Sequence, residues 1–191
     1  AADGGRGNDA IFGGNGADTM VGGLGDDVFF IANDSDHATG EIITGGDGPD
    51  TIRFTSVEAG TLVLTAGVTG VEEVVLEDNV GAATATAESI DASALTAGIT
   101  LTGNGAINTL TGSAFNDTIE GVGAVADIIN AGAGDDALTI LDENVVDGGD
   151  GTDTATFETA VDETVMLDAD LVNVENIVVD GAGALSINLS V

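Results

Sequence analysis

Three nonapeptides follow one another without a gap near the start of the chain, and they constrain the fold strongly. The nonapeptides are GGRGNDAIF from Gly4, GGNGADTMV from Gly13 and GGLGDDVFF from Gly22. The sixth residue of each is an aspartate: Asp9, Asp18 and Asp27. The eighth residue of each is large and apolar: Ile11, Met20 and Phe29. Because one short repeat cannot bury its apolar residue alone, the pattern predicts that successive repeats stack into a solenoid.

Each nonapeptide provides about six turn residues and three strand residues, which is half of one coil. Two nonapeptides then make a coil of about 18 residues, and stacked coils are separated by the inter-strand spacing of roughly 4.8 Å. The apolar eighth residue points inward and builds a narrow core. The expected fold class is therefore all-β, a parallel β-roll or β-helix.

A second run of repeats is more degenerate than the first. Its nonapeptides begin at Gly103, Gly112, Val122 and Ala131. Their sixth residues are Asn108, Asp117, Asp127 and Asp136, and their eighth residues are Leu110, Ile119, Ile129 and Leu138. The apolar spacing is kept while some glycines and one aspartate are lost. This run supports the fold more strongly than it supports a metal site.

A longer duplication relates the two halves of the chain. The segment GGDGPDTIRF from Gly45 matches GGDGTDTATF from Gly148, and the same offset of 103 relates VEEVVL from Val71 to VENIVV from Val174. We therefore expect two tandem copies, residues 1–100 and 101–191, each a β-roll with a following strand segment. The first copy carries six extra residues, which we place within 33–40, so the segment around His37 is expected to be a surface excursion.

The glycines and aspartates of these loops suit a calcium site. Glycine permits turns that direct carbonyl oxygens inward, and calcium takes oxygen ligands at 2.3–2.6 Å. Since loops on one side of the roll are two repeats apart, we expect Asp9 and Asp27 to share an ion. Carbonyl groups near Arg6, Asn8, Gly23 and Gly25 would complete its shell. Magnesium fits less well, because it demands near-ideal octahedral geometry.

Further calcium ligands are expected on the other side of the roll and in the second copy. Asp18, with carbonyl groups near Asn15 and Ala17, needs another loop on its own side, which we assign to Asp50. In the second copy the candidate ligands are Asp117, Asp127, Asp136 and Asp153. Zinc and copper lack their preferred ligands, because the chain has one histidine and no cysteine.

The excess of acidic residues indicates that the folded chain binds a cation. The chain has 34 Asp and Glu residues against two arginines, Arg6 and Arg53, and a net charge of -32. Nucleic acids and anionic membranes attract Lys and Arg, so neither is an expected partner. No apolar run is long enough to span a bilayer. General solubilising acidity would spread the carboxylates, whereas many aspartates here recur at fixed positions in glycine-rich turns.

Catalysis is not expected. One histidine and no cysteine leave no set of nucleophile, base and orienting group. The paired acids Asp26/Asp27 and Asp135/Asp136 are explained better by calcium than by glycosidase chemistry. Glu72 and Glu175 recur at the same place in both copies, and we expect them to have a structural role, such as hydrogen bonding to a neighbouring turn.

These repeats resemble the RTX (repeats-in-toxin, hemolysin-type) calcium-binding family. The segment GGDG-x-DT followed by VE-x-VVL, with SIDASAL from Ser89 and LTGNG from Leu101, also resembles arrays in bacterial surface-layer proteins and large adhesins. The resemblance implies type I secretion and folding on calcium outside the cell. Two functions then remain: a surface-layer or adhesin module, or the carboxy-terminal calcium domain of a secreted enzyme such as a protease, lipase or epimerase. The expected partners are further coils of the same or neighbouring chains, including self-assembly.

Overall fold

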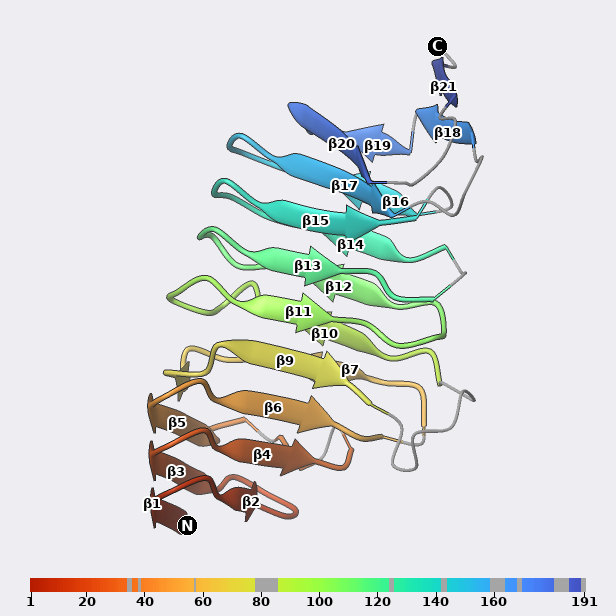
Figure 1. Cartoon of the computed structure of the whole chain (residues 1–191). Helices are drawn as coiled ribbons and strands as arrows, with labels where there is room; N and C mark the ends of the chain where they lie inside the picture. The colour runs from red at the N-terminus through yellow and green to blue at the C-terminus, as the bar shows by residue number, and fades with distance from the viewer. Residues whose placement is uncertain are drawn as a thin grey trace.

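The computed structural model describes residues 1–33, 36–37, 39–56, 58–77, 86–123, 126–141, 144–158, 164–167, 170–180 and 186–189. The chain climbs from its N-terminus through a stack of short strands (Figure 1). Neighbouring strands pair in parallel, and the described residues contain no α-helix. The predicted all-β parallel solenoid is confirmed.

One face of the solenoid is a single nine-stranded sheet that runs through both copies. In spatial order its strands are β2 (Ala10–Phe12), β4 (Val28–Ile31), β6 (Thr51–Phe54), β9 (Glu73–Leu76), β11 (Thr100–Thr102), β13 (Thr118–Glu120), β15 (Ala137–Ile140), β17 (Thr154–Glu158) and β20 (Asn176–Asp180). Strand β9 of the first copy pairs directly with β11 at the start of the second. The two copies are therefore joined by continuous backbone hydrogen bonding.

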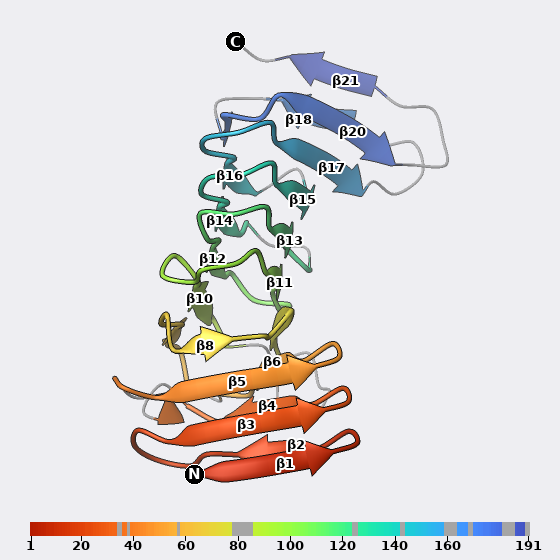
Figure 2. The same ribbon diagram turned by 90° about the vertical axis from the view of Figure 1, so that its left-hand side faces the viewer.

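The opposite face consists of two shorter sheets that meet within one coil (Figure 2). The four-stranded sheet contains β1 (Ala2–Arg6), β3 (Thr19–Leu24), β5 (Ile42–Asp47) and β8 (Val68–Thr69). The six-stranded sheet contains β7 (Thr61–Val63), β10 (Ser89–Asp91), β12 (Thr109–Thr111), β14 (Ile128–Asn130), β16 (Val145–Asp147) and β19 (Leu171–Val172). A separate pair, β18 (Thr164–Leu167) and β21 (Ser186–Leu189), lies beyond them.

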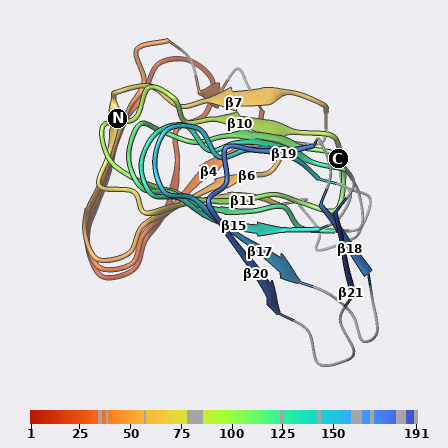
Figure 3. The ribbon, with the colours of Figure 1, turned by 90° about the horizontal axis from the view of Figure 1, so that it is seen from above.

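The core is a narrow apolar column between the two faces, which appear as two layers when the molecule is viewed from above (Figure 3). The eighth residue of every repeat points into it, as the spacing predicts. The buried eighth residues are Ile11, Met20, Phe29, Leu110, Ile119, Ile129 and Leu138. Burying one such side chain contributes about 1.5–3 kcal/mol, so the stacked repeats supply the apolar stabilisation that a single repeat lacks.

The strand register measures the length of each coil. Ala10 pairs with Val28, a step of 18 residues, which confirms the predicted coil of two nonapeptides. From Val28 to Thr51 the step is 23, whereas the equivalent step in the second copy, from Ala137 to Thr154, is 17. The six extra residues of the first copy therefore lie between β4 and β5, as predicted.

The expected surface excursion is wrong at Asp36 and His37, which are buried, whereas residues 39 and 40 are exposed. His37 is 9% exposed, and its Nδ1 lies 3.6 Å from Oε1 of Glu41, which is 1% exposed. Glu41 is buried because it directly precedes β5, and His37 lies against it. Residues 34, 35 and 38 of this segment lie outside the described residues.

Candidate metal centre

Two sets of loops connect the faces. We call the loops that lead into strands of the nine-stranded sheet leading loops, and those that leave it return loops. Each leading loop except the one before β11 has an acidic residue directly before its strand, and these side chains stack along one edge of the solenoid. This carboxylate column consists of Asp9, Asp27, Asp50 and Glu72 in the first copy and of Asp117, Asp136, Asp153 and Glu175 in the second.

In the first copy each column carboxylate after Asp9 accepts a hydrogen bond from the backbone of the preceding leading loop. The Asp9 N–H donates to Oδ1 of Asp27 at 2.8 Å, and the Asp27 N–H donates to Oδ1 of Asp50 at 2.8 Å. The Asp50 N–H donates to Oε2 of Glu72, also at 2.8 Å. The structure therefore brings Asp9 and Asp27 together in successive loops, the placement that a shared ion requires.

We call this series of hydrogen bonds between successive leading loops a ladder, and the second copy repeats it. The Asp117 N–H donates to Oδ1 of Asp136 at 2.7 Å, and the Asp136 N–H donates to Oδ1 of Asp153 at 2.9 Å. The Asp153 N–H donates to Oε2 of Glu175 at 2.9 Å. Both ladders thus end on a glutamate, which agrees with the structural role expected for Glu72 and Glu175.

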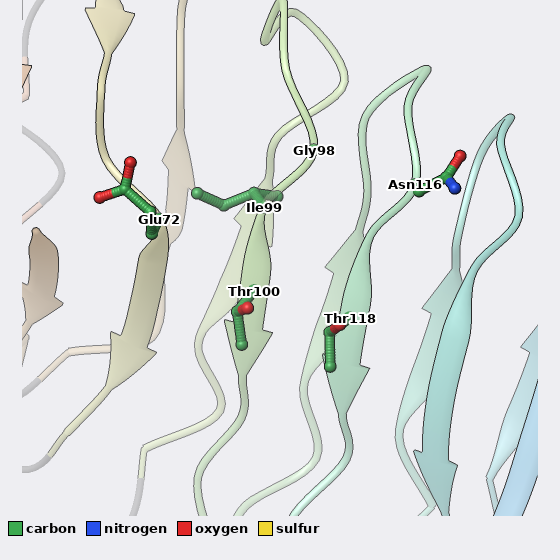
Figure 4. A pocket seen from close by; sticks show the side chains of 6 residues that line it. All are labelled: Glu72, Gly98, Ile99, Thr100, Asn116 and Thr118. Atoms are coloured by element: carbon green, nitrogen blue, oxygen red, sulfur yellow. The ribbon is translucent and has the colours of Figure 1, made fainter. Parts of the chain in front are cut away.

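The column is interrupted between the copies. The leading loop before β11 ends in Gly98 and Ile99, so it has no acid to place above Glu72. A cavity of about 240 Å³ lies there, and Figure 4 shows Glu72 beside Ile99 with Asn116 on the following loop. The ladder resumes where the Ile99 N–H donates to Oδ1 of Asp117 at 2.8 Å.

The second carboxylate oxygens of most column aspartates have no protein partner. Oδ2 is buried without a hydrogen bond in Asp9, Asp27, Asp50, Asp136 and Asp153. The last four of these residues are at most 2% exposed. Burying an unpaired anionic oxygen costs several kcal/mol, so these atoms require a cation or a proton.

Backbone carbonyl groups converge with these oxygens. A Cβ built on Gly4 would lie 2.7 Å from Oδ2 of Asp9 and 2.7 Å from the carbonyl oxygen of Gly22 in the next loop. On Gly148 a Cβ would contact Oδ2 of Asp153 and the carbonyl oxygen of Asn173. The absence of a Cβ at the first glycine of the loop thus lets oxygens from two successive loops approach each other.

The donor set fits calcium. Carboxylate and carbonyl oxygens are hard ligands of the kind calcium prefers. Among the described residues, no three His, Asp or Glu side chains form a group that could hold a metal ion by themselves. Carbonyl groups would therefore have to supply the remaining ligands, as the glycine-rich loops permit.

Close stacking of the loops explains the glycines at positions two and four. Gly23 and Gly25 have φ angles of 116° and 123°, a region that side chains rarely adopt. A Cβ on Gly23 would overlap the carbonyl oxygen of Gly5, and one on Gly25 would lie 2.9 Å from Oδ1 of Asn8. The loops that carry the predicted ligands Arg6, Asn8, Gly23 and Gly25 are thus in direct contact, while the Asn8 side chain itself accepts from the Asp26 N–H at 3.0 Å.

Asp117 differs from the other column aspartates because the protein satisfies both of its oxygens. Oδ2 accepts from the Ser113 N–H at 2.6 Å, and Oδ1 accepts from the Ser113 hydroxyl at 3.0 Å and from Ile99. Ser113 stands where a complete repeat has its second glycine. The predicted ligand Asp117 is therefore a poorer candidate than Asp136 or Asp153.

The return loops hold the remaining predicted ligands, and one predicted pairing there is wrong. Asp18 lies in a return loop with Asn15 and Ala17, whereas Asp50 lies in a leading loop, in the column with Asp27. The reason is that the chain makes a return loop and strand β5 between β4 and β6, as it makes a return loop and β16 between β15 and β17, so Asp50 lies a full coil after Asp27. Glu41 takes the place corresponding to Asp18.

Amide groups supply hydrogen bonds in the return loops of the second copy, although Oδ2 of the predicted ligand Asp127 is buried without a partner. Oδ1 of Asp127 accepts from the Asn108 N–H at 2.8 Å. Burial raises the pKa of Asp127, and the hydrogen bonds from the Asn108 N–H and the Asn144 side chain oppose this shift. Nδ2 of Asn108 donates to the Glu88 carbonyl oxygen at 2.9 Å. The Asn108 side chain, at the sixth position of its repeat, is thus held by hydrogen bonds within the protein.

The electrostatics of the column favour a bound cation at neutral pH. Burial, and to a smaller extent the charges of Asp117, Asp153 and Asp135, raises the pKa of Asp136 from 3.8 to about 6. Burial likewise raises the pKa of Asp50 and Asp153. A carboxyl whose pKa is raised by folding stabilises the metal-free fold only while protonated, so this contribution is lost as the pH rises through about 6.

Comparison with known proteins agrees with this geometry. Four segments, residues 2–29, 38–53, 102–121 and 122–139, match the RTX calcium-binding nonapeptide repeat. No similar curated protein and no similar solved structure was found. Within the described residues, no helix is long and apolar enough to cross a membrane.

Proposed function

This chain carries RTX calcium-binding nonapeptide repeats, and from that premise we propose that it is a secreted structural module that folds as calcium enters its loops. The observation that carries the proposal is the set of buried, unpartnered Oδ2 atoms along the carboxylate column. Without a cation, these oxygens must either stay buried as anions without solvent or belong to protonated carboxyl groups. With calcium they become ligands, and the same atoms then hold successive loops together.

The net charge of -32 opposes folding of the metal-free chain. Self-repulsion opposes compaction, and the solenoid brings its acids to a spacing of one coil. Extracellular calcium modules bind with dissociation constants of about 10⁻⁴–10⁻³ M. A module in that range stays unfolded where calcium is scarce and folds outside the cell, which suits export in an unfolded form by type I secretion.

We further propose a surface-layer or adhesin role rather than a catalytic one. One continuous nine-stranded sheet joins the two copies, so the module is a rigid rod suited to display or spacing. The single histidine, His37, is buried beside Glu41 and not displayed toward a substrate. Association with further coils of the same or a neighbouring chain remains a prediction of the sequence.

A calcium titration followed by far-ultraviolet circular dichroism tests this function. The protein in excess chelator should be largely disordered, and a β spectrum should appear with a midpoint of about 0.1–1 mM calcium. Magnesium at the same concentration is the control and should induce much less β structure. A β spectrum that is already complete in chelator would contradict the proposal.

A further inference from the structure

Two short turns occupy the last position of each ladder although they lack the nonapeptide pattern. They are Gly70–Glu72 before β9 and Asn173–Glu175 before β20, and they are related by the offset of 103 residues. Neither turn lies in a segment that matches the repeat family. In a complete repeat the acid comes five residues after the first glycine, as Asp27 follows Gly22, whereas here it comes only two residues later.

The carbonyl oxygen of each turn takes the place that the carbonyl oxygen of the first glycine has in a complete loop, although Gly4 and Gly22 themselves do not have a positive φ. Gly70 has a φ of 59°, and Asn173 has a φ of 50° as the one residue other than glycine with a positive φ in the described chain. This conformation places the Gly70 carbonyl oxygen against Gly45 and the Asn173 carbonyl oxygen against Gly148. In the first coils the Gly22 carbonyl oxygen lies against Gly4 in the same way.

The glutamate side chains accept the same backbone hydrogen bond as the column aspartates. Oε2 of Glu72 accepts from the Asp50 N–H, and Oε2 of Glu175 accepts from the Asp153 N–H, just as Oδ1 of Asp27 accepts from Asp9. The additional methylene of glutamate lets the shorter turn reach the same backbone amide. Each turn therefore offers one carbonyl oxygen and one carboxylate, the two ligand types of a complete loop.

The leading loop that precedes each turn in the ladder has a carboxylate oxygen without a hydrogen-bond partner. Oδ2 of Asp50 and Oδ2 of Asp153 are buried and unpartnered, and their residues are 1% and 0% exposed. A Cβ on Gly45 would contact both Oδ2 of Asp50 and the carbonyl oxygen of Gly70. The unpartnered oxygen of Asp50 and the carbonyl oxygen of the short turn therefore converge on Gly45.

We propose that the turns Gly70–Glu72 and Asn173–Glu175 each complete a calcium site with the loop below, with Glu72 and Glu175 as carboxylate ligands. The proposal rests on the proposed function and adds two sites that the nonapeptide pattern does not contain. The glutamate follows the aspartate of its site by 22 residues in both copies. Both glutamates are exposed, so the far side of each site remains open to water.

Native mass spectrometry and calorimetry of the full chain, titrated with calcium alone, test the proposal. Glu72→Gln and Glu175→Gln keep an oxygen that accepts the backbone hydrogen bond but lose the charge. Each variant should lose one ion or bind it at least about tenfold more weakly, and the double variant should lose two. Glu73→Gln, whose native carboxylate accepts from the Thr51 hydroxyl, is the matched control and should bind as many ions as the wild type.

Unchanged ion number and affinity in both glutamine variants would overturn the proposal and leave the glutamates as hydrogen-bonding caps. A wild-type chain that binds no calcium would instead overturn the proposed function. Circular dichroism at saturating calcium checks that the variants fold. Infrared spectroscopy of protein labelled with ¹³C-glutamate gives an independent result, because calcium should shift a glutamate carboxylate band in the wild type but not in the double variant.

Discussion

Replacing Asp27 by Asn should remove at least one bound calcium ion, whereas the same change at Asp117 should leave the number of bound ions unchanged. Asp27 keeps one buried oxygen without a protein partner, and asparagine puts a neutral amide in its place. Both oxygens of Asp117 already accept hydrogen bonds from Ser113 or Ile99. Asn108 shows within this chain that an asparagine at the sixth position can be satisfied by the protein alone.

Calorimetry and native mass spectrometry on the two variants give the ion numbers. Asp27→Asn should also weaken the overall calcium affinity at least about tenfold, since carboxylate number sets calcium affinity. Asp117→Asn should cost stability through its lost hydrogen bonds, typically about 1–3 kcal/mol, without changing the stoichiometry. Equal ion losses in both variants would show that the unpartnered oxygen does not mark a calcium ligand.

Replacing Gly45 by Ala should destabilise the calcium-bound fold by about 3 kcal/mol. The new Cβ would overlap the Gly70 carbonyl oxygen and Oδ2 of Asp50, which are fixed by the backbone and by the column. Gly13→Ala is the matched control. Its Cβ would meet Sδ of Met20 at 3.1 Å, a flexible thioether that can move, so the cost should stay below about 1 kcal/mol.

Urea unfolding at saturating calcium measures both changes. A lower midpoint with an unchanged slope reports a change in stability. Similar midpoints for Gly45→Ala and Gly13→Ala would mean that the space above Gly45 is not filled by fixed oxygens, and the proposed stacking of the loops would be wrong there.

The sequence predicted the solenoid because its periodic signals are local. The eighth residue of each repeat had to be inside, and Ile11, Phe29 and Leu138 are buried. The coil of 18 residues followed from two half-coils and agrees with the pairing of Ala10 with Val28. Such inferences need only the spacing of apolar residues and glycines along the chain.

The site was predicted less completely because its contacts join residues of different loops. The segment between Asp27 and Asp50 does not show the nonapeptide spacing, so the return loop and strand β5 within it were not counted and Asp50 was assigned to the wrong side. The satisfaction of Asp117 by Ser113 depends on the local hydrogen bonds of a degenerate loop. The recurrence of Glu72 and Glu175 was visible, but their position above Asp50 and Asp153 required the strand register.

Amide hydrogen exchange with and without calcium tests most directly whether calcium at the carboxylate column holds the loops together. In saturating calcium, the backbone amides of Asp9, Asp27, Asp136 and Asp153 should exchange at least about 100-fold more slowly than in chelator, because local opening then requires release of an ion. The same protection of these amides in chelator as in calcium would contradict the account.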